Sequence, residues 1–310
     1  MIKLFCQVLL IFLSVLVYTQ PCVAQPLQTT SSTAQELLHQ GITKMLHGEN
    51  AAAIKDLTQA IAIQDNLTSA YSNRCLAYIY LAQYQTAIAD CDRAIELNPN
   101  HTEAYLHRGL AHYRLGNYQA AIVNYNYLIK HKPYDFRAYY NRGIALSAIG
   151  HYESAIASYN QALSQIPYQV RFFVADIYND RGLAYFGLQN YEGAIADFSL
   201  AIRLNGNDAR AYYNRGCACQ QHGDEHNAIN DFTQSLRLNP ANIAAYVNRG
   251  LARYQLGYQQ AAIADLQKAS QGYLRQGKTA ASQKILKLLR KIQLNTNESQ
   301  IASITDCKVI

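Results

Sequence analysis

The stretch YYNRGIALSAIGHYESAI, residues 139–156, contains a pattern that recurs along most of this chain of 310 residues. Gly143 marks a position that returns in steps of 34, 34, 34, 39, 34 and 34 residues. The marker positions are Gly41, Cys75, Gly109, Gly143, Gly182, Gly216 and Gly250. A fixed period of this length is typical of stacked supersecondary units. The repetition therefore predicts one extended array of units, although the length alone would also allow two globular domains.

Each unit is predicted to be an antiparallel helical hairpin. Numbered from seven residues before the marker, the units begin at residues 34, 68, 102, 136, 175, 209 and 243, and the last extends to residue 276. Apolar residues return at helical spacing in each half, and a turn such as 115–117 divides the halves. A proline such as Pro99 then ends the second helix, because it disfavours helix at the residue before it.

Small residues on one helix of the predicted hairpin face large residues on the other. We call each position of a unit a slot and count it from the first residue of the unit. Folding a unit about its central turn brings slot eight, the marker, level with slot twenty-four. Several units carry a large aromatic residue at slot twenty-four, namely Tyr125, Tyr159, Phe198 and Phe232. Since glycine has no side chain, this pairing lets the two helix backbones approach closely.

The repeated residues resemble those of the tetratricopeptide repeat family. The unit AYYNRGIALSAIGHYESAIASYNQALSQIP, residues 138–167, carries the aromatic, glycine, alanine and proline positions of that family, and the resemblance covers residues 34–276. It implies an all-α fold, a right-handed superhelical α-solenoid of seven helix-turn-helix units. In this family the first helices line a concave groove that commonly binds peptides or protein segments.

The resemblance also implies which residues line the groove. Slots two, five, nine and twelve of the first helices would face it, and they hold mixed aromatic and polar side chains suited to a peptide. The candidate binding residues are Tyr113, Arg137, Tyr140, Phe186, Arg210, Tyr213 and Tyr254. Slot nine contains no asparagine, so the carboxylate clamp of the chaperone-binding branch is not expected.

An arginine recurs at slot seven and an aspartate at slot twenty-three. Free arginines would form a basic ladder for acidic ligands or nucleic acid, whereas ion pairs would fix the register between units. We favour pairs between each aspartate and the arginine of the following unit, with pairing inside one unit as the competing geometry. The expected pairs are Asp56 with Arg74, Asp90 with Arg108, Asp197 with Arg215, and Asp231 with Arg249.

The first residues differ from the repeats. Lys3 precedes an apolar run at 4–17, and small residues at 22 and 24 would allow cleavage before Gln25. This pattern predicts a signal peptide at 1–24 followed by a linker at 25–33, with an uncleaved membrane anchor as the alternative. Because the repeats are similar to those of bacterial, especially cyanobacterial, proteins, we expect export to the periplasm or the thylakoid lumen.

Export would allow disulfides to form. Removal of the signal leaves five cysteines, Cys75, Cys91, Cys217, Cys219 and Cys307, so at least one is unpaired within the chain. In the second unit Cys75 replaces the glycine and Cys91 replaces the aromatic residue. Because these slots face each other, a disulfide is one hypothesis and two small buried thiols are the other.

The step of 39 residues adds five residues after Pro167. Arg171, Phe172 and Phe173 could form an exposed docking loop, since function often lies on irregular insertions. The alternative is an early start of the next helix, with its apolar face packed inward.

The residues after the last unit are predicted to form a capping helix at 277–294, followed by a tail at 295–310. SQKILKLLRKI, residues 282–292, separates an apolar face from a basic one. Seven basic and no acidic residues lie between Lys268 and Lys291, so most of the net charge of +6 is located here. Packing against the last unit is expected, and contact with a membrane surface or an acidic partner is the alternative.

We find no convincing catalytic, phosphate-binding or metal-binding motif. His222 and His226 lie on a predicted turn, and basic residues are not interleaved with aromatic residues as in an RNA-binding module. The sequence therefore predicts a non-enzymatic scaffold without cofactor or nucleic acid, which binds a protein segment. The alternative is a membrane-associated assembly factor for a protein complex. The partner and the oligomeric state are not predicted.

Overall fold

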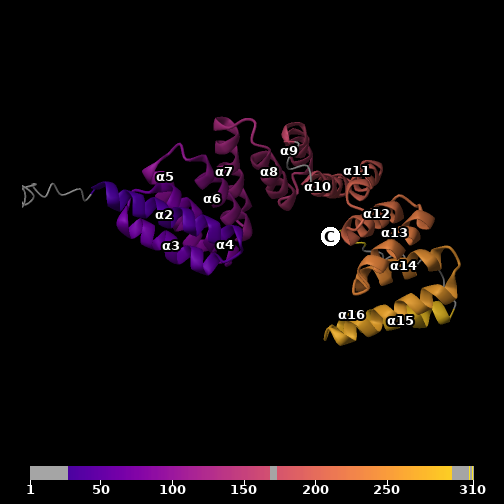
Figure 1. The fold of residues 1–310 in the computed structure, drawn as a ribbon. Coiled ribbons are helices and arrows are strands. Elements are labelled where there is room, and N and C mark those ends of the chain that lie inside the picture. The colour runs from indigo at the N-terminus through magenta and orange to yellow at the C-terminus, as the bar shows by residue number, and fades with distance from the viewer. Residues whose placement is uncertain (1–26, 168–172, 295–306, 308, 310) are drawn as a thin grey trace, which may run out of the picture. The chain divides into compact units, whose positions relative to one another are not determined.

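The structure, a computed structural model, describes residues 27–167, 173–294, 307 and 309. These residues form fifteen α-helices and no strand (Figure 1). The chain divides into two compact units, residues 1–104 and 105–310, named here the N-terminal unit and the C-terminal unit. The prediction of an all-α solenoid built from helical hairpins is confirmed.

The N-terminal unit contains two helical hairpins. Its helices are α2 (Leu27–Leu46), α3 (Asn50–Ile63), α4 (Thr68–Tyr80) and α5 (Tyr84–Leu97). Leu38, Leu57 and Leu67 are buried between α2, α3 and the start of α4. Helix α2 begins seven residues before the expected start of the first repeat, so it includes most of the expected linker.

The C-terminal unit continues the same alternation of first and second helices. Its helices are α6 (Thr102–Arg114, which crosses the boundary of the units), α7 (Tyr118–His131), α8 (Phe136–Ala148), α9 (Tyr152–Gln165), α10 (Val174–Gly187), α11 (Tyr191–Leu204), α12 (Ala209–Gln221), α13 (Glu225–Leu238), α14 (Ile243–Gln255), α15 (Gln259–Arg275) and α16 (Thr279–Gln293). Helices α6, α8, α10, α12 and α14 are the first helices of their repeats.

The predicted contact between glycine and an aromatic ring is present in the four hairpins from the third repeat to the sixth. A Cβ atom built on Gly143 of α8 would lie only 2.6 Å from Cε1 of Tyr159 on α9. The same contact joins Gly182 to Phe198, where the distance would be 2.8 Å. Tyr159 and Phe198 are almost fully buried, so any larger residue at the glycine would displace a core ring.

The turn inside each hairpin needs a left-handed backbone at slot fifteen. Gly150 has φ 77° there, but the fifth repeat has Gln189 with φ 59°. A residue with a Cβ atom is strained in this conformation by about 1–2 kcal/mol.

Replacing Gln189 by glycine is therefore expected to raise the free energy of unfolding by up to about 1 kcal/mol, because relief of strain exceeds the added chain entropy. Chemical denaturation followed by circular dichroism measures the change. Gln161→Gly, at an exposed position inside α9, serves as the control and should lower stability by about 1 kcal/mol. Equal losses for both variants would contradict the account of the turn.

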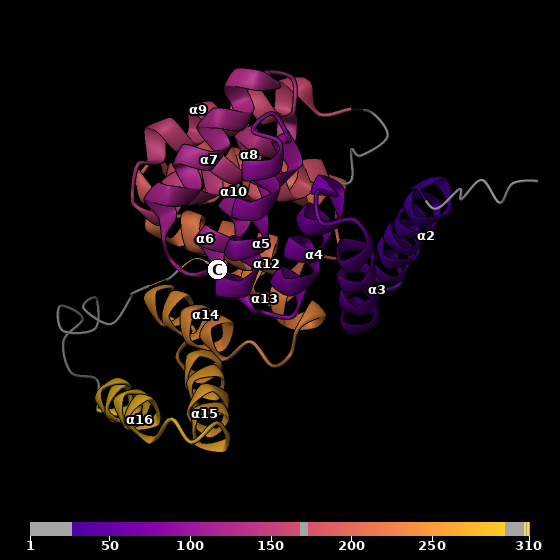
Figure 2. The same cartoon turned by 90° about the vertical axis from the view of Figure 1, so that its left-hand side faces the viewer.

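Helix α16 covers the end of the last hairpin, as expected for a cap (Figure 2). Ile285, Leu288 and Ile292 are buried in one cluster with Leu251 of α14 and Leu266 of α15. The basic side chains Lys284, Lys287 and Arg290 remain exposed. The cap therefore combines a packed apolar face with a solvated basic face.

The predicted signal peptide and most of the predicted tail lie outside the described residues. No helix within the described ranges 27–167 and 173–294 has the length and apolar character needed to cross a membrane.

Candidate functional site: the groove of the C-terminal unit

Four of the slot-seven arginines are paired with carboxylates of their own repeat. Arg74 forms a bidentate ion pair with Asp90, in which Nε donates to Oδ2 at 2.7 Å and Nη2 donates to Oδ1. Arg181 forms the same bidentate pair with Asp197. The remaining pairs of this kind are Arg215 with Asp231 and Arg249 with Asp265. In the third and fourth repeats, Asn124 and Ser158 accept from the Nε atoms of Arg108 and Arg142.

Our prediction of pairs between neighbouring repeats was wrong for Asp56 with Arg74, Asp90 with Arg108, Asp197 with Arg215, and Asp231 with Arg249. Slots seven and twenty-three face each other inside one hairpin for the same reason that slots eight and twenty-four do. Asp56 has no arginine at slot seven of its repeat and pairs with Lys44 at 2.6 Å.

The arginines nevertheless connect neighbouring repeats through a third nitrogen. Five of them donate from Nη1 to a polar side chain at slot twenty-five of the preceding repeat. The pairs are Arg74 with Thr58 at 3.0 Å, Arg142 with Asn126 at 3.0 Å, Arg181 with Asn160 at 2.6 Å, Arg215 with Ser199 at 3.0 Å, and Arg249 with Thr233 at 3.0 Å. These guanidinium groups are engaged in packing and do not form a free basic ladder.

Polar side chains join the first helices of the C-terminal unit to one another. Tyr140 Oη on α8 donates to Asp180 Oδ2 on α10 at 2.8 Å. Asn214 Nδ2 on α12 donates to Asn179 Oδ1 on α10 at 3.1 Å, and Asn248 Nδ2 on α14 donates to Tyr213 Oη at 3.0 Å. These bonds fix the spacing of the helices that form the groove.

Several of the predicted groove residues are engaged in hydrogen bonds or packing contacts within the protein. Tyr213 is 1% exposed and accepts from Asn248, so it packs between helices and offers no open surface. Tyr254 packs against the cluster under α16, and the Phe186 ring lies 5.4 Å from that of Tyr191. Tyr140 is bound to Asp180, as described above. The expectation of an open aromatic surface therefore does not hold for Tyr213.

The two predicted groove arginines are paired at the starts of their helices. Arg137 contacts Asp135, the residue that caps α8, at 2.6 Å. Arg210 contacts Asp208, which caps α12, at 2.9 Å and Asp176 of α10 at 3.2 Å. The Arg210 guanidinium is about half exposed and remains within reach of an acidic ligand.

A hollow of about 350 Å³ lies on the first helices α6, α8 and α10 and on the second helix α9. Its walls combine aromatic, aliphatic and polar side chains. They are Tyr113, Ile144, Ser147, Ala148, Tyr152, Tyr159, Asp180, Leu183 and Val309. The predicted residue Tyr113 is therefore part of this hollow, whereas Val309 comes from a distant part of the chain.

Asp180 is the main ionisable group of the hollow, and we did not predict it from the sequence. Burial raises the pKa of its carboxyl group from 3.8 to about 6, against the opposing effect of the hydrogen bond from Tyr140. The sequence signal that could have revealed it is at slot six. Asp180 occupies this slot in the fifth repeat, whereas Asn141, Asn214 and Asn248 occupy it in other repeats.

The raised pKa of Asp180 gives a pH dependence with a definite sign. Because the folded state holds this proton up to about pH 6, the free energy of unfolding should fall as the pH rises from about 4 to about 6. Asp180→Asn removes the titrating carboxyl group. The free energy of unfolding of this variant, relative to that of the parent protein, should therefore increase as the pH rises through this window. Denaturation at several pH values measures the difference. A constant difference between the two proteins would contradict the prediction.

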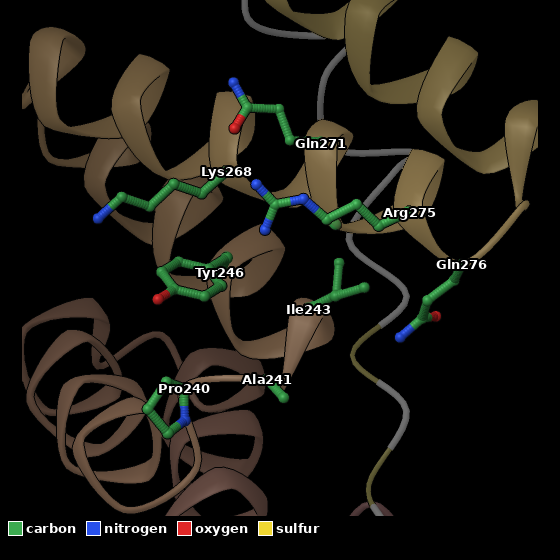
Figure 3. A pocket seen from close by; sticks show the side chains of 9 residues that line it. Pro240, Ala241, Ile243, Tyr246, Lys268, Gln271, Arg275 and Gln276 are labelled. Carbon is green, nitrogen blue, oxygen red and sulfur yellow. The ribbon is translucent and has the colours of Figure 1, made fainter.

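A second hollow, of about 360 Å³, lies between the α13–α14 connection and α15. Figure 3 shows Lys268, Gln271 and Arg275 on its α15 side and Ile243 and Tyr246 on its α14 side. The ammonium group of Lys268 lies 5.6 Å from the centre of the Tyr246 ring. This hollow therefore carries positive charge from the basic stretch noted in the sequence.

The predicted docking loop is only partly described. Arg171 and Phe172 lie outside the described residues. Phe173 directly precedes α10 and is 37% exposed, and its ring centre lies 6.3 Å from that of Phe136 on α8.

Four cysteines form two disulfides. Cys75 of α4 is bonded to Cys91 of α5, which corresponds to the first of our two hypotheses for that hairpin. Cys217 of α12 is bonded to Cys307, which lies 90 residues away in the chain. Cys219 is a buried free thiol, and burial raises its pKa to about 12. Among the described residues, no group of three or more metal-capable side chains could hold a metal ion.

Family models for tetratricopeptide repeats match residues 76–138, 136–168, 182–223, 209–242 and 243–271. The chain belongs to the tetratricopeptide repeat family. These matches extend over both units described above and include all or part of the first helices α6, α8, α10, α12 and α14. No curated protein matches the chain.

Solved structures support the fold of these tetratricopeptide repeats. The crystal structure of MamA is 26% identical, with a TM-score of 0.51, over 55% of this chain and 96% of MamA. A tetratricopeptide repeat protein from Parabacteroides merdae is 19% identical, with a TM-score of 0.59, over 84% of this chain and 99% of that protein. YrrB, described as having an unusual peptide-binding site, is 20% identical, with a TM-score of 0.51, over 63% of this chain and 97% of YrrB.

Proposed function

We propose that this protein is a non-enzymatic scaffold that binds a protein segment in the groove of its C-terminal unit. Tetratricopeptide repeat proteins bind protein or peptide partners, and YrrB is described as having a peptide-binding site. The observation that carries the proposal is the hollow on α6, α8 and α10. Tyr113, Ile144 and Leu183 supply apolar contact area there, and Asp180 supplies a polar group. Such a combination gives both affinity and orientation to a bound segment.

Selection of peptides from a random displayed library tests this proposal. The target is the full chain without the Cys217–Cys307 disulfide, obtained as the Cys307→Ser variant. Selected peptides should lose at least about tenfold in affinity on Ile144→Arg, since the new charge disrupts the apolar wall. Val123→Arg is the matched control, because Val123 is 60% exposed on the second helix α7. Equal affinity for both variants, or the absence of any selected peptide, would contradict groove binding.

We also propose that the protein is exported, with the periplasm or the thylakoid lumen as its location. The sequence features of residues 1–24 motivate this proposal. The two disulfides support it, because disulfides persist in oxidising compartments and are rare in the cytosol. N-terminal sequencing of the protein from its native cell should begin at Gln25, whereas a start at residue 1 would contradict cleavage.

The basic face of α16 favours a second candidate function, that of a membrane-associated assembly factor. Its apolar residues are already buried against α14 and α15, so the exposed Lys284, Lys287 and Arg290 would act by charge alone. The protein should then co-sediment with vesicles that contain phosphatidylglycerol and be released by salt. Equal sedimentation with neutral vesicles, or none with either kind, would contradict this candidate.

A further inference from the structure

Cys307 brings a distant segment of the chain onto the groove. Its bond to Cys217 attaches the segment to α12, at slot nine of a first helix. Cys307 is 5% exposed, and its Sγ atom accepts from Asn248 Nδ2 on α14 at 2.9 Å. Cys307 is therefore seated against two neighbouring first helices.

Val309 gives a second and independent contact. It packs against the buried cluster that contains Tyr213, Cys217 and Phe232. It also forms part of the wall of the hollow, together with Ile144 of α8 and Leu183 of α10. Val309 thus contacts the hollow to which the proposed function assigns the partner, and Cys307 contacts the first helices beside it.

We propose that the segment containing Cys307 and Val309 is an intramolecular occupant of the groove, held there by the Cys217–Cys307 disulfide, and that a partner segment binds once a dithiol reductant opens this bond. The inference rests on the proposed function, because it names the occupant that a partner must replace. It commits to a chemistry for the partner as well, namely an extended segment with a small aliphatic residue at the place of Val309.

The opening step is a thiol–disulfide exchange. One thiolate of the reductant attacks a sulfur of the Cys217–Cys307 bond, and its second thiol then resolves the mixed disulfide. The reductant becomes a disulfide, and Cys217 and Cys307 become thiols, so two electrons and two protons are transferred. Cys219 lies two residues from Cys217 but stays protonated near neutral pH because burial raises its pKa. Cys219 is therefore a poor nucleophile and does not readily displace Cys307 from its bond to Cys217.

The disulfide matters because it changes the competition for the groove. A segment attached only through the main chain, without the disulfide, acts at an effective concentration in the millimolar range, which a partner of micromolar affinity can overcome. A segment fixed by a disulfide cannot leave the groove until the bond opens. The oxidised protein should therefore be closed to partners and the reduced protein open.

A labelled peptide provides the test. The probe has the sequence of residues 303–310 with serine in place of Cys307, and its binding is measured by fluorescence anisotropy. The full-length Cys307→Ser/Val309→Asp variant should bind the probe at least about tenfold more tightly than the oxidised parent protein. Both substitutions lie outside the helices, so the helical residues that line the groove are unchanged. Peptide mapping without reductant should recover the Cys217–Cys307 link from the parent protein.

Cys219→Ser is the matched control and should bind the probe as weakly as the oxidised parent protein does, because it leaves the Cys217–Cys307 bond in place. Equal binding by the oxidised parent and the double variant would overturn the inference. So would an absence of binding to the double variant at about 1 mM probe, the effective concentration of a short tether. Library peptides that bind through Ile144 would in those cases still support the proposed function, so the two failures are distinguishable.

Discussion

Replacing Asp265 by alanine is expected to lower the free energy of unfolding by about 3–5 kcal/mol, because it leaves the buried Arg249 and the partly buried Arg253 without their anion. Asp265 is 2% exposed and contacts two arginines. Arg249 donates to it from Nη2 and Nε at 2.7 and 2.8 Å, and Arg253 donates from Nη1 at 2.7 Å. Arg249 is itself buried, so water cannot fully replace the lost carboxylate.

Chemical denaturation monitored by circular dichroism measures this loss. Glu96→Ala is the control, since Glu96 and Arg93 form an exposed pair at 3.1 Å that should contribute less than about 1 kcal/mol. A loss of under about 1 kcal/mol for Asp265→Ala would show that the buried pairs do not hold the repeats together.

Phe198→Ala should also cost about 3–5 kcal/mol, because it opens a cavity at the centre of a hairpin. Phe198 is fully buried against Gly182, so the opposing helix offers no side chain to fill the space. Thermal and chemical denaturation should both show the destabilisation.

Phe198→Leu is the matched control, because two other repeats of this chain have leucine at the equivalent position. The first repeat places Leu57 against Gly41, and the last repeat places Leu266 against Gly250. Leucine at 198 should therefore fit the same contact and cost only about 1–2 kcal/mol. If leucine and alanine are equally destabilising, the ring contact with glycine is not what sets the spacing of the helices.

The hairpins could be predicted from the sequence because each is specified by local, repeated residues. Gly143 and Tyr159 lie sixteen positions apart in one unit, and folding about the central turn is enough to bring them together. The same geometry should have indicated Arg74 with Asp90, also sixteen positions apart. We expected the following repeat instead, although the arginine reaches the preceding repeat only through its third nitrogen.

The contents of the groove were harder to predict, because they depend on contacts outside the period. Cys307 lies beyond the last repeat and has no counterpart in other units, so no spacing relates it to Cys217. The pKa of Asp180 depends on how deeply α8 and α10 bury it, which is a tertiary property. The burial of Tyr213 likewise follows from Asn248 in the next repeat.

The most direct test of groove binding is methyl NMR of the Cys307→Ser/Val309→Asp variant during titration with a library-selected peptide. The account predicts shifts at Ile144 and Leu183 on the first helices α8 and α10. It predicts no shift at Val123 or Leu204, which are exposed on the second helices α7 and α11. Shifts at Val123 and Leu204, with Ile144 and Leu183 unchanged, would contradict it.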